Sequence, residues 1–415
     1  MRIGLVGGMA NAMYCFTRVL RQQGYDAEYV EDEQDAFPMS QPLWEEVPLT
    51  LDPSRFGSEL LDVRGWRELA SSNGWHEPSW IVRPEARPRK LDLLRAGRAA
   101  RWTGHSELRT LYRYLRALEP VVDRLRSYDR LVVCGIRNVE AMLSGRPYVF
   151  WPHGGDVHIV PFRSDSGFDR AFARLSRAAI LRAEVAGTHD PTIAAGMEKL
   201  GRRGPIPYLP FLVDIDRYSP GQPTTPVAVE VAGQAAGRRV VFLASRQDFY
   251  WKGTDRFARA FAATVKAGAP LYLAVTPWGA DVEATRRIFA DAGVLDSVHY
   301  LESAVSKPIL RDLYRISDLV VDQFTVTAFG SLMLEAMACG TPVLINLDLD
   351  AFRSRWPEFV PPPGLRASTE EEIEAVLRAL VDVDAGLSGL GRASREWIET
   401  HHGPEKAELY VGGAG

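Results

Sequence analysis

The fold is decided by the stretch Ser317-Asp-Leu-Val-Val-Asp-Gln-Phe-Thr-Val-Thr-Ala-Phe-Gly-Ser-Leu-Met-Leu-Glu-Ala-Met-Ala-Cys-Gly-Thr-Pro-Val343. Its pattern is that of a buried strand, a glycine turn, a helix, a glycine stop and the next strand. Gly330 and Ser331 would open the helix, where free N–H groups and the helix dipole favour a phosphate. Glu335 follows about one turn later, where its carboxylate can accept hydrogen bonds from ribose hydroxyls. The alternative is an acidic residue that only complements the dipole.

The same alternation of short apolar runs with helix-period segments extends along the whole chain. It predicts an α/β fold of two doubly wound, Rossmann-like domains, with ligands bound in the cleft between them at the carboxyl ends of the strands. The expected domains are residues 1–205, with a Pro-, Trp- and Arg-rich insertion at about 37–104, and residues 206–395. The passage 205–226 is Pro-rich, as an interdomain linker would be. The predicted strands are 3–6, 26–30, 131–134, 148–151, 239–244, 271–275, 298–301, 319–322 and 342–346, with a helix at 12–23.

The composition and charge of the chain exclude some classes of protein. The chain has 415 residues, 46% hydrophobic and 25% charged, with a formal net charge of −4. This balance argues against a disordered protein and against a dedicated nucleic-acid binder, which needs a basic surface. The three cysteines have no metal-ligand spacing, so we expect reduced thiols. No apolar run has the length of a membrane span, and the first residues lack the features of a signal peptide, so a cytoplasmic location is expected.

The decisive stretch resembles the signature of retaining glycosyltransferases with the GT-B fold, the large group called family 4 or group 1. The matching positions are Phe329-Gly330, Glu335-Ala336-Met337-Ala338, Gly340 and Pro342-Val343. One departure is that Thr327 stands where the family has a Glu that touches the donor sugar, with Ala328 in place of a glycine. The resemblance therefore implies that recognition of the donor sugar is altered, or is shared with Asp322 and Gln323.

A second element supports this resemblance. The segment from Val240 to Gly253 is an apolar strand that leads to Arg246 and Lys252, and in the family an Arg and a Lys at this place clamp the diphosphate of a nucleotide sugar. Two cations suit this task because cleavage of a glycosyl–phosphate bond leaves a dianion. Lysine is also rare in this arginine-rich chain. Residues 209–220 are similar to the family's linker. The tail at 396–415 resembles the segment that crosses back to the first domain.

The first half carries weaker signals. The turn Trp151-Pro-His-Gly-Gly-Asp-Val-His158 resembles a His-Gly-x-Asp turn of the family, in which His153 lies near the donor sugar and Asp156 contacts donor or acceptor. The loop from Gly7-Gly8 to Asn11 resembles a loop beside the diphosphate and acceptor. It is not the dinucleotide fingerprint Gly-x-Gly-x-x-Gly, which disfavours a nicotinamide dehydrogenase.

Residues 83–101 concentrate basic side chains, with Trp66, Trp75, Trp80 and Trp102 nearby. This composition fits a surface that contacts membranes or acidic acceptors, or a solvated helix face with Trp anchors, and we favour the second interpretation.

Together the signals predict a retaining, metal-independent glycosyltransferase with front-face chemistry. It would need no cofactor beyond its nucleotide-diphosphate sugar, and the acceptor would be a sugar, a small molecule or a lipid-linked group. Two alternatives stay open. One is a GT-B nucleotide-sugar epimerase, and the other, suggested by Thr327, is a non-catalytic nucleotide-sugar-binding relative.

Overall fold

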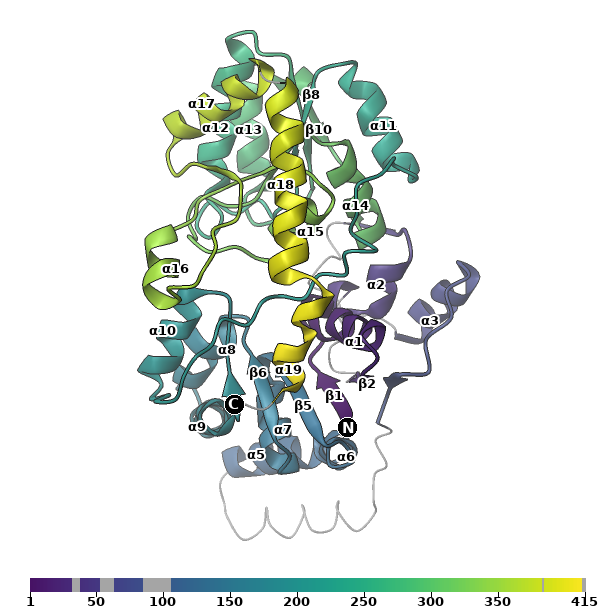
Figure 1. Cartoon of the computed structure of the whole chain (residues 1–415), viewed down its shortest axis with the longest axis vertical. Coiled ribbons are helices and arrows are strands. Elements are labelled where there is room, and N and C mark those ends of the chain that lie inside the picture. The colour runs from purple at the N-terminus through teal and green to yellow at the C-terminus, as the bar shows by residue number, and fades with distance from the viewer. Residues whose placement is uncertain (32–37, 53–62, 85–105, 383, 413–415) are drawn as a thin grey trace. The chain divides into compact units, whose positions relative to one another are not determined.

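The computed structural model describes residues 1–31, 38–52, 63–84, 106–382 and 384–412 (Figure 1). These residues form two compact units. Unit 1 comprises Met1–Ala36, His76–Leu212 and Glu405–Gly415, and unit 2 comprises Phe37–Trp75 and Val213–Pro404. The chain therefore passes between the units at 36/37, 75/76, 212/213 and 404/405.

Unit 1 is built on a parallel six-stranded sheet with the order β4-β2-β1-β5-β6-β7. Helices α1 and α7 pack on its central strands, as expected for alternating strands and amphipathic helices. Its strands are β1 (Arg2–Val6), β2 (Asp26–Val30), β4 (Ile81–Val82), β5 (Arg130–Cys134), β6 (Tyr148–Trp151) and β7 (Val185–Ala186). Its helices are α1 (Ala12–Gln22), α5 (Ser106–Ala117), α6 (Glu119–Leu125), α7 (Asn138–Ser144), α8 (Gly155–His158), α9 (Gly167–Arg182), α10 (Pro191–Lys199) and α19 (Glu408–Val411), with 3-10 turns η1 (Met9–Asn11), η3 (Gly135–Arg137), η4 (Val160–Phe162) and, spanning 404/405, η6 (Pro404–Ala407).

Unit 2 has a second parallel six-stranded sheet, with the order β10-β9-β8-β12-β13-β14, and a small antiparallel pair, β11-β3. Its strands are β3 (Thr50–Leu51), β8 (Arg239–Leu243), β9 (Leu271–Val275), β10 (Val298–Tyr300), β11 (Ala304–Val305), β12 (Leu319–Val321), β13 (Val343–Ile345) and β14 (Leu365–Arg366). Its helices are α2 (Pro42–Glu46), α3 (Val63–Ser72), α11 (Pro226–Ala235), α12 (Thr254–Lys266), α13 (Val282–Ala292), α14 (Lys307–Ile316), α15 (Ser331–Ala338), α16 (Leu349–Arg355), α17 (Glu370–Asp382) and α18 (Asp384–His402), with 3-10 turns η2 (Pro38–Ser40) and η5 (Leu295–Ser297).

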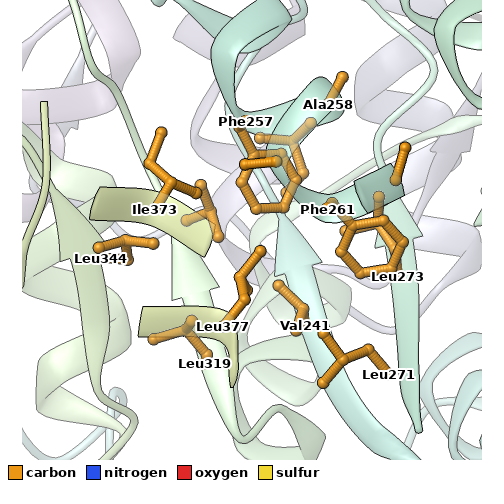
Figure 2. Packing of buried hydrophobic residues seen from close by; sticks show 14 of the residues in the cluster. Val241, Phe257, Ala258, Phe261, Leu271, Leu273, Leu319, Leu344, Ile373 and Leu377 are labelled. Carbon is orange, nitrogen blue, oxygen red and sulfur yellow. The ribbon is translucent and has the colours of Figure 1, made fainter. Parts of the chain in front are cut away.

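One hydrophobic core of unit 2 lies between its sheet and the helices α12 and α17. Figure 2 shows Phe257 and Phe261 of α12 and Leu377 of α17 pointing toward Val241 and Leu273 of the strands. All five side chains are fully buried. Strands buried in this way read as continuous apolar runs, which is why the sequence reveals them.

The segment that the sequence marks as an insertion contributes to both units. Residues 38–52, called the arm below, belong to unit 2, where β3 pairs with β11. Leu43 and Val47 of the arm share a small apolar core with Ala70 of α3. Strand β4, by contrast, extends the sheet of unit 1 beside β2. Much of the predicted insertion is therefore ordered structure, and the rest of it lies outside the described residues.

The predicted fold class is confirmed, because both sheets are parallel and alternate with helices. Every predicted strand is present within a residue or two of its expected bounds, and so is the first helix. The two-residue strands β3, β4, β7, β11 and β14 were not predicted. The tail returns to unit 1 at Glu405, where Tyr410 donates a hydrogen bond to the Pro210 carbonyl, 2.6 Å away.

Candidate functional site

Two cations lie on the loop that follows β8 at the carboxyl edge of the second sheet. Lys252 Nζ lies 3.2 Å from Asp322 Oδ1 and donates to Gln323 Oε1 at 2.5 Å. Asp322 and Gln323 follow the adjacent strand β12, so the sheet itself brings the three side chains together. Arg246 pairs with Asp248 at 3.3 Å, and its side chain is 40% exposed. Lys252 is therefore held by two partners, whereas Arg246 is accessible to solvent.

The backbone of this loop is fixed by glycine. Gly253 caps α12 with φ 65°, and a Cβ built there would lie 2.8 Å from Thr325 Oγ1. Only glycine combines this left-handed backbone with so close an approach. The Lys252 carbonyl accepts a hydrogen bond from the Phe324 N–H at 2.7 Å, so the β8 and β12 loops are tied together next to the cations.

Helix α15 presents an uncapped N-terminus at the same edge. Its cap residue, Gly330, has an extended backbone and no side chain to occupy the first N–H groups, and Ser331 begins the helix. Free N–H groups at a helix start attract anions. The preceding loop is closed by a hydrogen bond from Gln323 Nε2 to the Ala328 carbonyl. Thr327 lies in this loop, half-buried, and its carbonyl accepts from the Asp348 N–H at 3.1 Å.

Glu335 lies on α15 with both carboxylate oxygens engaged. Lys307 Nζ donates to Oε1 at 2.5 Å, and the Tyr314 hydroxyl donates to Oε2 at 3.2 Å. Burial and the neighbouring carboxylate raise the pKa of Tyr314 well above its usual value, so it stays a hydroxyl donor. Glu335 therefore does more than complement the helix dipole, because it anchors two side chains of α14.

In unit 1, His153 follows β6 and packs edge-on against Trp151, with ring centroids 4.9 Å apart. Burial, together with His189, lowers the pKa of His153 to about 4. The imidazole is therefore neutral at pH 7. Its Nε2 is buried and has no hydrogen-bond partner. A neutral ring with an unsatisfied nitrogen is suited to exchange a hydrogen bond with a ligand hydroxyl.

Asp156 organises the turn in which His153 lies. Its carboxylate accepts hydrogen bonds from the backbone N–H groups of His153, at 3.0 Å, and Gly154, at 2.8 Å. Burial nevertheless raises the pKa of Asp156 to about 6. The structure therefore shows that Asp156 stabilises the turn. Its contact with a substrate stays a prediction.

The loop after β1 brings Gly8 and Asn11 to the carboxyl edge of the first sheet. Both residues are buried, and the Asn11 N–H donates to the Gly8 carbonyl at 2.9 Å. Gly7, with φ 127°, lies so close to Cys134 that a Cβ would approach its Sγ to 2.5 Å. The loop is therefore packed against β5. Its predicted role beside a diphosphate or an acceptor stays a prediction.

The structure thus groups the predicted residues into two sets. The set in unit 2 comprises Arg246, Lys252, Gln323, Thr327, Gly330, Ser331 and Glu335. The set in unit 1 comprises Gly8, Asn11, His153 and Asp156. The sequence interpretation gave no role to Lys307 or Tyr314. For Lys307 a signal existed, because it is one of only six lysines in the chain.

Other sequence expectations concern metals, thiols and membranes. Within the described ranges, no three His, Cys, Asp or Glu side chains are grouped as a metal ion requires. Cys15, Cys134 and Cys339, all within the described residues, are in no disulfide. No helix in the described part of the chain has the length and apolar character needed to cross a bilayer. Most of the basic stretch 83–101 lies outside the described residues.

Comparison with solved structures identifies the architecture. HepE from Anabaena, solved with UDP and glucose, aligns with a TM-score of 0.61 at 15% identity, covering 99% of this chain and 98% of that one. Sucrose-phosphate synthase from Thermosynechococcus elongatus aligns at 0.58 and 14% identity, covering 99% and 97%. WaaG, a glycosyltransferase involved in lipopolysaccharide biosynthesis, aligns at 0.54 and 15% identity over the whole of both chains. The fold is GT-B.

The family comparison adds a local match. Residues 231–347 match the family model of glycosyl transferases group 1. The match includes Arg246, Lys252 and Glu335 and ends just beyond the stretch that decides the fold. Among curated proteins none matches the chain. The comparisons therefore show the GT-B fold for the chain, and a match to glycosyl transferases group 1 for residues 231–347.

Proposed function

We propose that the protein is a retaining glycosyltransferase of the family 4 type. It would transfer a sugar from a nucleotide-diphosphate sugar to an acceptor, without a metal ion or a further cofactor. The observation that carries this proposal is the convergence, at one sheet edge of unit 2, of Lys252, Arg246 and the uncapped start of α15, inside the region that matches the family. Solved neighbours with UDP or UDP-glucose are consistent with a nucleotide-sugar donor.

The diphosphate of the donor would interact with these groups. Lys252 is held by Asp322, whose side chain is only 2% exposed, so the ammonium group cannot swing away into solvent without leaving a buried charge unpaired. Arg246 has the greater freedom and can reach an incoming oxygen. Two cations and free N–H groups would stabilise the negative charge that develops on the leaving group.

The nucleoside would lie at Glu335, whose carboxylate can accept hydrogen bonds from ribose hydroxyls. His153, Asp156 and Asn11 in unit 1 are assigned to the sugar and the acceptor, and Gly8 to the donor beside its diphosphate. A neutral His153 can bond a sugar hydroxyl without charge.

The proposed chemistry is a front-face displacement. The acceptor oxygen would form a bond to the anomeric carbon while the bond from that carbon to the phosphate oxygen breaks. The leaving diphosphate would take the acceptor proton, so the step needs no protein base. The new bond keeps the configuration of the donor.

The test is a panel of UDP-, GDP-, ADP- and dTDP-sugars, incubated with acceptor sugars and followed by release of nucleoside diphosphate. NMR of the product would give the anomeric configuration, and a parallel reaction with EDTA would test metal independence. We expect one donor to be consumed, with retention and without inhibition by EDTA. Inversion of configuration or loss of activity in EDTA would contradict those parts of the proposal.

The panel also separates the alternatives. Conversion of the donor to an epimer without transfer would identify an epimerase. Binding without turnover of any donor would identify a non-catalytic relative, the interpretation to which Thr327 points. Either result would overturn the proposal.

A further inference from the structure

We propose that Lys307 is a positioning residue for nucleoside recognition. It would hold the Glu335 carboxylate in one orientation, so that the carboxylate binds the ribose hydroxyls of the donor. This inference rests on the proposed function, because it assigns Glu335 to the ribose. It adds a residue that the sequence motif does not contain.

The geometry fixes Glu335 from two directions. Lys307 opens α14 and Tyr314 lies seven positions later, so both project from one face of that helix. Lys307 holds Oε1 at 2.5 Å and Tyr314 holds Oε2 at 3.2 Å. Each carboxylate oxygen has two acceptor positions, so one on each oxygen remains for a ligand. Two oxygens of a fixed carboxylate match the two neighbouring hydroxyls of a ribose.

Burial explains why a cation is needed. The side chains of Glu335 and Lys307 are only 5% and 16% exposed. A carboxylate in such surroundings requires a charged or hydrogen-bonding partner. A buried ion pair adds little net stability compared with well-packed apolar residues. Specific recognition is therefore the better explanation for the pair, because an apolar pair in its place would bind no hydroxyls.

Lys307 is itself held in place by the arm. The preceding residue, Ser306, is fully buried, and its hydroxyl donates to the Val47 carbonyl and accepts from the Leu49 N–H, each at 2.7 Å. The Ser306 N–H donates to the Leu49 carbonyl at 2.9 Å. These three bonds determine where α14 begins, and so where the Lys307 side chain starts.

The competing explanation is that the Lys307–Glu335 pair only joins α14 to α15. The two roles predict different results. A purely structural pair would change the unfolding temperature and leave ligand selectivity unchanged. A positioning residue would change the discrimination between ribose and 2′-deoxyribose, because Glu335 reads the hydroxyls.

The experiment measures binding of UDP, GDP and ADP and of their 2′-deoxy counterparts by calorimetry. It uses the wild type, Lys307→Met, Lys307→Arg and Glu335→Gln, with Lys266→Met as a control at an exposed lysine of the same unit. For the nucleotide that the wild type prefers, we expect Lys307→Met to weaken ribonucleotide binding roughly tenfold, the loss of one charged hydrogen bond. Binding of the 2′-deoxy form should fall less, so the selectivity ratio should approach that of Glu335→Gln.

The controls separate the possible outcomes. Lys307→Arg should restore most of the selectivity, and adding Lys307→Met to Glu335→Gln should have little further effect. A wild-type selectivity ratio in Lys307→Met would overturn the inference, even if the variant melts earlier. If Lys307→Met does not fold, Lys307→Gln decides, because it also removes the cation: loss of selectivity in a folded Gln variant supports positioning, and a wild-type selectivity ratio at lower stability contradicts it. If the wild type binds no nucleoside diphosphate, the proposed function itself fails.

Discussion

Arg246 and Lys252 differ in how deeply the acidic partner of each is buried, and so in the cost of replacing each cation by alanine. Replacing Arg246 by Ala removes an accessible cation, and its partner Asp248 remains partly exposed. Replacing Lys252 by Ala also leaves the buried Asp322 without its cation. We expect both variants to lose about 2–4 kcal/mol of transition-state stabilisation, and only Lys252→Ala to melt at a lower temperature. Turnover and thermal unfolding, measured with Lys266→Ala as control, check this. Near-normal turnover in both variants would contradict the clamp.

Thr327 is the residue at which the chain departs from the family signature. If the departure reflects a different donor sugar, Thr327→Glu should lower activity with the native donor, because a carboxylate without matched hydroxyls is costly to desolvate. The site is half-buried, so this cost is partial. Nucleoside diphosphate release from a donor panel by both forms is the measurement. Equal turnover of every donor would show that this position does not read the sugar, and hydrolysis gained only by the variant would indicate a non-catalytic wild type.

The lowered pKa of His153 gives stability a pH dependence with a defined sign. The pKa in the folded chain is about 4, against an ordinary histidine value of 6.5. Between these values the unfolded chain binds a proton that the folded chain does not, so the contribution of His153 to stability falls as pH drops from 6.5 to 4. Asp156, with its pKa raised to about 6, acts in the opposite direction over an overlapping range.

Comparing the variant His153→Gln with the wild type separates the effect of His153 from the opposite effect of Asp156, because Asp156 is present in both proteins. Its stability relative to the wild type should improve by about 2 kcal/mol between pH 7.5 and pH 4.5. Thermal unfolding of both proteins at the two pH values tests this. A difference in unfolding temperature that does not change with pH would mean that the imidazole is exposed to solvent.

At the scale of elements, the arm and α14 form one assembly through Ser306. Replacing Ser306 by Ala leaves the buried Val47 carbonyl and the Leu49 N–H without their partner. We expect a loss of about 1–3 kcal/mol of stability, because unsatisfied buried groups are costly. The exposed Ser71 provides the control, Ser71→Ala, which should leave the unfolding temperature unchanged. An equal effect of both substitutions would contradict the role of the arm.

The helices and strands also show which parts of the fold could be predicted from the sequence. Long strands such as β8 were predictable because burial on both faces gives them continuous apolar runs. Strands β7 and β14 have two residues each, too few to show a period. The segment 317–343 predicted the start of α15 correctly, and phosphate binding there stays a prediction. The pairing of Lys307 with Glu335 was not predictable, since a helix, a strand and a loop separate them and only the tertiary fold joins their helices.

At the scale of the whole molecule, the candidate groups are divided between two units with separate cores. The cations, the start of α15 and Glu335, assigned to the diphosphate and the ribose, belong to unit 2, as does Thr327. His153, Asp156 and Asn11, assigned to the sugar and the acceptor, belong to unit 1, as does the Gly8 loop. The group 1 match covers only residues 231–347, which lie in unit 2. The binding roles proposed for unit 1 therefore rest on the residues of unit 1 alone, and a separate experiment tests them.

Hydrogen exchange of the full chain provides that test. A nucleoside diphosphate alone should slow exchange in the segments 246–253 and 323–335 of unit 2, since both cations, the start of α15 and Glu335 lie there. The segment 153–156 of unit 1 should gain protection only when the sugar donor and an acceptor are both present. At a hundredfold excess over Kd, ligand binding stabilises the folded state by about 2.7 kcal/mol, enough to be seen as slower exchange. Protection of the segment 153–156 by the nucleoside diphosphate alone would contradict this division, because it would place the diphosphate at His153 instead of at Lys252.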